Sequence, residues 1–191
     1  MTLRIRPEAP ADEPAVQALI AAAFRPADHA GGPVVEEVLN DALRRDPDWI
    51  ARWSLVAEVD GEITGSAIIG RQIVGQVTSS YGVLADPDPA VPDRRVVAVG
   101  PVAVLPSRQR TGIGSELLRA VIEGADAAGE PMIVLLGSPD FYGRFGFVAA
   151  STVGIGAPDP SWGKYFQIRT LAAHDAGMIG QFRYAAPFRG L

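Results

Sequence analysis

The sequence contains no cysteine and only two histidines, His29 and His174. The absence of cysteine excludes disulfide bonds, thiolate metal ligands and a cysteine nucleophile. Two histidines far apart in the chain also argue against a histidine-rich metal site or a serine–histidine triad. We therefore expect no bound metal, and chemistry that depends on neither a thiol nor a metal ion.

Long apolar segments and basic runs are missing as well. No apolar run approaches the roughly 18 to 20 residues of a membrane-spanning helix, and residues 1–13 lack the apolar stretch of a signal peptide. No stripe of basic and aromatic residues indicates nucleic-acid binding. We expect a soluble, cytoplasmic protein with neither a membrane nor a nucleic-acid partner.

The composition is that of a globular protein, with 48% apolar and 20% charged residues in a chain of 191. This length fits one compact domain over residues 1–191. The net charge of −5 is unevenly spread, because residues 1–100 carry 15 acidic and 9 basic side chains, whereas residues 101–191 carry 7 and 8. The second half is therefore the better host for an anionic ligand.

Local patterns in the first half predict two helices among strands. Alternation predicts a strand over residues 3–7, and helical spacing of apolar residues predicts helices over 11–24 and 31–46. Two apolar runs around Asp60-Gly61 predict a β-hairpin over 54–74. Three prolines within residues 84–93 predict a surface loop after it.

The second half predicts a strand, a helix and a strand in succession. A β-branched run over 94–106 is interrupted by Gly100-Pro101, which indicates a bulge or kink. A helix over 115–129 and a strand over 132–137 follow, and this order gives parallel pairing of the two strands. A short helix within 138–147 and a last strand over 165–171 complete the prediction.

The segment LPSRQRTGIGSEL, residues 105–117, places two glycines beside two arginines where the helix begins. A helix N-terminus presents unpaired N–H groups that bind phosphate, and Gly112 and Gly114 would let a pyrophosphate approach. Arg108 and Arg110 would add cations at the rim. The segment lacks residues that the P-loop motif and the dinucleotide-binding fingerprint each require. The segment alone leaves a tight turn and a phosphate site as alternatives.

The flanking residues give the segment a family resemblance. Residues 102–106 (VAVLP) followed by 109–114 (QRTGIG) resemble motif A of the GNAT superfamily of acetyl-CoA-dependent N-acetyltransferases. Residues 141–147 (FYGRFGF) resemble the Y-x-x-x-G-F element of the same superfamily. The exact sequence of residues 141–147, together with residues 54–65 and 180–188, resembles a narrower, YhbS-like branch of the superfamily. The first fifty residues and the proline loop match only loosely.

The resemblance implies a fold and a cofactor site. The fold is α/β, with an α+β mixed, twisted sheet of about six to seven strands, splayed at the kinked strand, and about four helices. Residues 1–191 would form a single N-acetyltransferase domain with acetyl-CoA as cosubstrate. The Val102 N–H would face the thioester carbonyl, and Val104 would pair with the pantetheine. The implied cofactor-binding residues are Val102, Ala103, Val104, Gln109, Arg110, Thr111, Gly112, Ile113, Gly114 and Ser115.

Tyr142 matches the tyrosine that the superfamily commonly uses as general acid toward the departing thiolate, although an aromatic packing role is the alternative. Many relatives place a carboxylate base on the kinked strand, and this chain has none there. Glu36, Glu37, Glu58 or a water chain stay open as the base. His29 falls near the expected acceptor side, and Arg144 either caps the short helix or meets a phosphate.

The resulting hypothesis is direct transfer of an acetyl group from acetyl-CoA to a primary amine of a small molecule or a peptide. A direct route is favoured because no cysteine can carry the acetyl group. A non-catalytic acyl-CoA-binding sensor and a purely structural interaction domain are the alternatives. The acceptor, the length of the acyl group and a homodimer formed through exposed strand edges are left open.

Overall fold

The computed structural model describes residues 2–26, 31–59 and 72–188. They form one mixed β-sheet with a main strand order of β1-β2-β3-β4-β5-β8-β6. The strands in the described residues are β1 Leu3–Pro7, β2 Leu55–Val59, β3 Gln72–Ala85, β4 Arg94–Val104, β5 Met132–Leu136, β6 Val148–Ala149, β7 Ile155–Gly156, β8 Phe166–Thr170 and β9 Gly180–Arg183. The α-helices there are α1 Glu13–Phe24, α2 Val35–Arg45, α3 Ile113–Ala127 and α4 Pro139–Tyr142.

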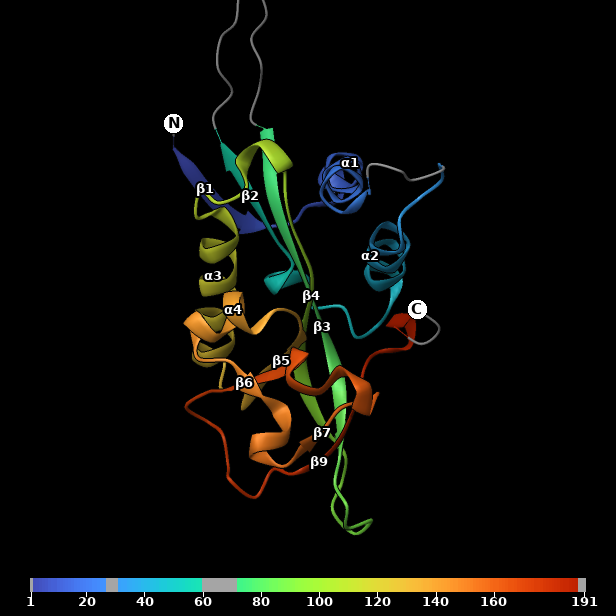
Figure 1. The fold of residues 1–191 in the computed structure, drawn as a ribbon, viewed down its shortest axis with the longest axis vertical. Helices are drawn as coiled ribbons and strands as arrows, with labels where there is room; N and C mark the ends of the chain where they lie inside the picture. Colours follow the sequence, from blue (N-terminus) through green and yellow to red (C-terminus); the bar gives the residue numbers. More distant parts are fainter. Residues whose placement is uncertain (1, 27–30, 60–71, 189–191) are drawn as a thin grey trace, which may run out of the picture.

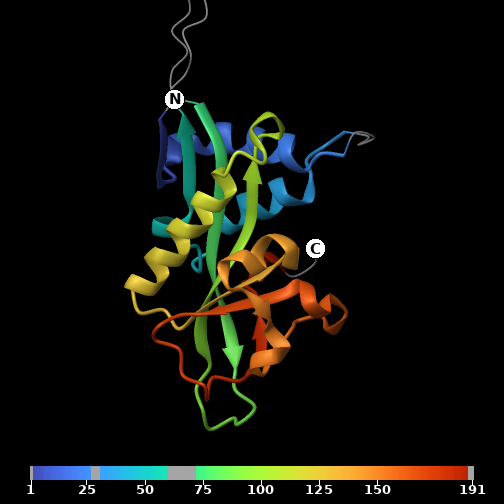
Figure 2. The same cartoon turned by 60° about the vertical axis from the view of Figure 1, so that its left-hand side comes forward.

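Helices cover both faces of the sheet. Helix α3 lies on one face, and α1 and α2 lie on the other (Figures 1 and 2). The apolar face of α3 is fully buried against β2 to β5, with Leu117, Leu118 and Val121 in the main core. On the other face of the sheet, Val16 and Ile20 of α1 pack against Val56 and Ala103. This arrangement explains the helical spacing of apolar residues in the sequence.

The mixed α/β fold expected from the sequence is confirmed. Strands β4 and β5 pair in parallel across α3, and β2 and β3 pair antiparallel. The register predicted for the hairpin is wrong, because Val59 pairs with Gln72 rather than with the residue that directly follows Asp60-Gly61. The turn at Asp60-Gly61 lies outside the described residues. Helix α2 begins at Val35 rather than at residue 31, because Gly31 and Gly32 have positive φ angles of 109° and 86°.

The sheet contains more strands than the sequence predicts. Strands β6, β7 and β9 are only two to four residues long, too short to show a period of two. Strand β9 pairs antiparallel with the end of β3, and β7 pairs in parallel with β9. The segment after residue 147 therefore joins the same sheet. None of the helices in the described residues combines the length and apolarity of a membrane span.

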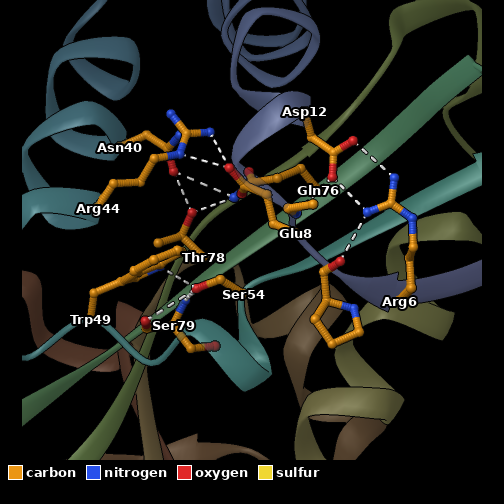
Figure 3. Close-up of polar contacts among 12 residues, drawn as sticks. Arg6, Glu8, Asp12, Asn40, Arg44, Trp49, Ser54, Gln76, Thr78 and Ser79 are labelled. Atoms are coloured by element: carbon orange, nitrogen blue, oxygen red, sulfur yellow. Dashed lines mark hydrogen bonds and ion pairs between the residues drawn. The ribbon is translucent and has the colours of Figure 1, made fainter.

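A buried polar network attaches α2 to the sheet (Figure 3). The Asn40 side chain on α2 is fully buried and contacts the Thr78 hydroxyl and the Gln76 amide of β3. Arg44, one turn later, donates from its Nε to Glu8 Oε1 at 2.6 Å. Because these groups are shielded from water, each needs its partner, and the network fixes the position of α2.

Substitution of Arg44 tests whether this network anchors α2 to the sheet. Its side chain and that of Glu8 are only 10% and 4% exposed. Burial raises the pKa of Glu8 from its ordinary value, although Arg44 acts in the opposite direction. Arg44→Met would leave a buried carboxylate without its ion-pair partner, so we expect a loss of about 3 kcal/mol in the free energy of unfolding at pH 7.

Chemical denaturation measures this loss, and Arg45→Met is the matched control. Arg45 pairs with Asp41 on the exposed side of α2, so its replacement should change stability by less than about 0.5 kcal/mol. The Arg44→Met deficit should shrink as the pH falls through the carboxyl range, because protonated Glu8 needs no cation. A deficit equal in both variants, or one independent of pH, would contradict the anchoring.

Candidate active site

The site begins where β4 loses one of its two neighbours. Strand β4 pairs with β3 as far as Val104, but with β5 only from Val97 to Val99. Gly100, with a φ of 152°, and Pro101 follow at once. From Pro101 to Val104, one edge of β4 therefore has no partner strand among the described residues. The sheet is splayed at the kink that the sequence predicts.

Two hydrogen bonds show which backbone groups face the splay. The Leu105 N–H donates to the Val74 carbonyl at 3.0 Å, so Leu105 faces β3. Hydrogen-bonded and non-hydrogen-bonded positions alternate along an antiparallel pair, so the N–H groups of Val102 and Val104 point away from β3. The Val104 carbonyl, on the same side, accepts from Gln109 Nε2 at 3.3 Å. Ala103 alternates toward β3.

The N-terminus of α3 lies beside this edge. Gly112 is the N-cap with a φ of 91°, a conformation that favours glycine. The N–H groups of Gly112, Ile113 and Gly114 donate to no other described residue. A Cβ added at Gly114 would lie 3.6 Å from Val104 Cγ2, which places the helix start directly against β4. Unpaired N–H groups at the start of a 15-residue helix form an anion-binding site.

A cavity of about 670 Å³, which we call the loop pocket, joins these features. Its lining, as far as the described residues form it, contains three arginines and no carboxylate, so its charge suits an anion. The lining residues are Val102, Val104, Arg108, Gln109, Arg110, Gly112, Ile113, Gly114, Ser115, Phe141, Tyr142 and Arg144.

Most of the predicted site residues thus line one pocket, and Ala103 and Thr111 do not. The Ala103 side chain is 1% exposed and packs toward α1. The Thr111 hydroxyl donates to the Arg108 carbonyl at 2.6 Å, which stabilises the loop before α3. Arg144 donates from its Nε to the Phe141 carbonyl and also lines the pocket.

Tyr142 lines the loop pocket. Its ring packs edge-on against Phe141 and Phe147, in contact with the main core. Burial raises the pKa of the Tyr142 phenol above its ordinary value, so the phenol stays neutral at physiological pH. Gly137 at the end of β5 makes room for the ring, because a Cβ there would lie 2.2 Å from Tyr142 Cε2. The sequence did not indicate this role for Gly137, although the residue directly follows a buried strand.

A second cavity of about 500 Å³, the kink pocket, lies at Gly100-Pro101. Val102 and Tyr142 line both pockets, so the two cavities adjoin at these residues. Glu36 is the one charged side chain among the described residues that line the kink pocket. The other lining residues are Phe24, Val35, Leu39, Val99, Gly100, Pro101, Leu136, Trp162, Tyr184 and Phe188.

The structure separates the three carboxylates left open as the base. Glu58 is 6% exposed and accepts from Arg6 Nε at 2.8 Å. Glu37 accepts the Val34 N–H at 2.8 Å and so caps α2. Glu36 lines the kink pocket and forms no hydrogen bond or ion pair with another described residue. His29 lies outside the described residues.

Comparison with known proteins identifies this arrangement. The model of the acetyltransferase (GNAT) family matches residues 15–147, more than half of the chain. A GNAT family acetyltransferase from Brucella melitensis, solved with acetyl-CoA, is 30% identical with a TM-score of 0.71, and the match covers 98% of each chain.

A second solved structure is the GNAT family N-acetyltransferase YhbS from Escherichia coli in complex with CoA. It is 26% identical with a TM-score of 0.77, and the match covers 97% of this chain and 91% of YhbS. No curated protein matches the sequence. The family match and the splayed strand beside a glycine-rich helix start agree, and the chain belongs to the GNAT family of acetyltransferases.

Proposed function

We propose that the protein transfers the acetyl group of acetyl-CoA directly to a primary amine. The observation that carries the proposal is the meeting of the two pockets at Val102 and Tyr142. One pocket suits a long anionic cosubstrate, and the other offers a separate entrance for an acceptor. Two relatives were crystallised with acetyl-CoA or CoA, which supports acetyl-CoA as the occupant of the loop pocket.

The loop pocket would hold acetyl-CoA mainly through backbone groups. The N–H groups of Gly112, Ile113 and Gly114 would bind the pyrophosphate, and nearby arginines would neutralise its charge. The outward N–H of Val104 would pair with the pantetheine arm. The Val102 N–H would donate to the thioester oxygen as negative charge develops there, a contribution of roughly 3 to 4 kcal/mol in comparable oxyanion sites.

The reaction needs three proton transfers. The acceptor ammonium loses a proton through Glu36 or water, and the neutral amine nitrogen forms a bond to the carbonyl carbon. The carbon–sulfur bond breaks, and Tyr142 donates its phenolic proton to the departing thiolate. The phenolate recovers a proton from the nitrogen as the amide forms. One proton is released to solvent overall.

We also propose that residues 1–191 act as a single N-acetyltransferase domain in the cytoplasm. The C-terminal part supports one domain, because β9 pairs with β3 and Trp162, Tyr184 and Phe188 line the kink pocket. A purely structural interaction domain would not need two adjoining pockets for ligands.

Calorimetry with acetyl-CoA, followed by thiol detection over a panel of primary amines, tests the proposed function. We expect acetyl-CoA binding and amine-dependent release of CoA. Binding without thiol release for any amine would favour the non-catalytic sensor. The absence of binding would contradict both functions.

Tyr142→Phe tests the general acid. We expect kcat to fall by about 100-fold, since positioned acids typically contribute 10²- to 10⁴-fold, while acetyl-CoA affinity stays unchanged. Because burial raises the pKa of this phenol, the wild-type kcat should not decline on the alkaline side until above about pH 10. Steady-state kinetics from pH 7 to 10.5 measure both effects. An unaltered kcat in the variant would remove Tyr142 from its role.

Gly114→Glu tests the loop pocket. The helical backbone at Gly114 accepts a side chain without strain, so the variant should fold while bulk and negative charge enter the pocket. We expect acetyl-CoA affinity to fall at least about tenfold by calorimetry. Ser107→Glu is the matched control, since it adds the same charge to an exposed position of the same loop outside the lining. Equal affinities of the two variants would contradict the assignment.

Gly137→Ala tests the placement of Tyr142. The added methyl group would overlap the Tyr142 ring, so the phenol must move. We expect kcat to fall by about 10- to 100-fold with a smaller effect on the KM for acetyl-CoA, because misplacing a catalytic group by about 1 Å can cost 10²-fold. Gly143→Ala is the control, since a Cβ at Gly143 meets no atom within 4 Å. Similar kcat values for both variants would show that Gly137 does not position Tyr142.

A further inference from the structure

The kink pocket has an unusual combination of walls and charge. Its described lining is apolar or aromatic on nearly every side, and it contains one carboxylate and no cation. We infer that this pocket binds the acceptor as a small primary ammonium ion joined to an aromatic or branched apolar group and lacking a carboxylate, with Glu36 as the partner of the ammonium. This inference deepens the proposed function and rests on it.

Three of the five aromatic residues in the described lining come from the C-terminal part of the chain. Tyr184 stacks on Phe188 with ring centroids 4.4 Å apart, and it lies within 6.2 Å of Trp162. Tyr184 is nearly buried, and burial raises the pKa of its phenol, so the wall stays uncharged. Val35 and Leu136 add apolar surface that is 57% and 45% exposed. Exposed apolar side chains gathered at a cavity mark a binding site.

The single charge of the pocket comes from α2. Glu36 has no hydrogen bond or ion pair with another described residue, so its carboxylate is available to a ligand. Its neighbour Glu37 is occupied with capping the helix. The buried contacts of Asn40 and Arg44 hold the next two turns of the same helix against the sheet (Figure 3). Glu36 therefore lies on a helix whose position is fixed against the sheet.

Charge complementarity selects the ligand class. An alkyl amine is protonated at neutral pH, since its pKa resembles the roughly 10.4 of lysine, and its ammonium group needs an anion in apolar surroundings. A free amino acid would also bring a carboxylate, which would meet Glu36 and no cation in the described lining. The cavity of about 500 Å³ lies in the range typical of small-molecule sites. We therefore expect arylalkylamines in preference to amino acids, polyamines and peptides.

Four probes with a primary amine separate these classes. They are 2-phenylethylamine, phenylalanine, 1,4-diaminobutane and a tripeptide with a free N-terminal phenylalanine. Calorimetry on the full chain saturated with CoA measures binding of each amine directly, because CoA carries no acetyl group and so no turnover occurs. The same titrations with acetyl-CoA report binding together with turnover. We expect 2-phenylethylamine to bind at least about tenfold more tightly than the other three, since each of those would place a further charged or polar group without a partner in this apolar pocket. Thiol release should follow the same order.

Glu36→Gln tests the ammonium partner. The exchange keeps the shape of the side chain and removes its charge, so the dissociation constant of 2-phenylethylamine should rise about tenfold or more while that of CoA stays the same. Asp41→Asn removes the same charge from α2 outside the pocket lining and should leave both constants unchanged. Equal effects of the two variants would overturn the role of Glu36.

Val35→Ser tests the apolar wall, and Val38→Ser is its matched control. Both valines are exposed on α2, at 57% and 53%, but only Val35 lines the pocket. We expect Val35→Ser to reduce the preference for 2-phenylethylamine over n-butylamine several-fold, and Val38→Ser to leave it unchanged. An unchanged preference in Val35→Ser would contradict the wall.

The outcomes distinguish this inference from the proposed function. Tighter binding of phenylalanine, 1,4-diaminobutane or the tripeptide would overturn the ligand class, even if thiol release showed that the protein is an acetyltransferase. Selective, Glu36-dependent binding of 2-phenylethylamine without thiol release would support the pocket and contradict catalysis. Absence of binding by 2-phenylethylamine to the CoA-saturated protein would overturn the inference directly.

Discussion

The unpaired edge of β4 is the constraint on which the rest of the site depends. Backbone N–H and C=O groups in a sheet require partners, and β4 continues to Val104 after β5 has separated at Val99. The outward N–H groups of Val102 and Val104 are therefore available to an extended ligand. A ligand that follows this edge reaches the start of α3 at one end and the kink at the other, so one strand sets both its direction and its register.

Several close approaches keep these parts together. Gly75 on β3 lets Ile113 and Leu117 of α3 lie directly on the sheet, because a Cβ there would be 2.7 Å from Ile113 Cγ2. Gly137 does the same for Tyr142 at the end of β5. The start of α3 is thus held against β3, beside the outward edge of β4, and the phenol is held at the end of β5. Rigid placement of this kind is what positions reacting groups in an active site.

Much of the loop pocket could be predicted from the sequence because its residues are local. The kink, the glycines and the helix start lie within residues 100–115, and FYGRFGF supplies Tyr142. The kink pocket could not be predicted, since Glu36, Trp162, Tyr184 and Phe188 come from distant segments. They meet only through pairing of β9 with β3 and packing of α2, and no local period encodes either.

Residue-resolved amide hydrogen exchange, with and without acetyl-CoA, tests the role of the β4 edge most directly. The amides of Val102 and Val104 point away from β3, whereas the amide of Ala103 points toward it. We predict that acetyl-CoA slows exchange at Val102, Val104 and Gly112–Gly114, while Ala103 is protected in both states. Protection of Val102 and Val104 in the free protein, or no change when acetyl-CoA binds, would contradict the account.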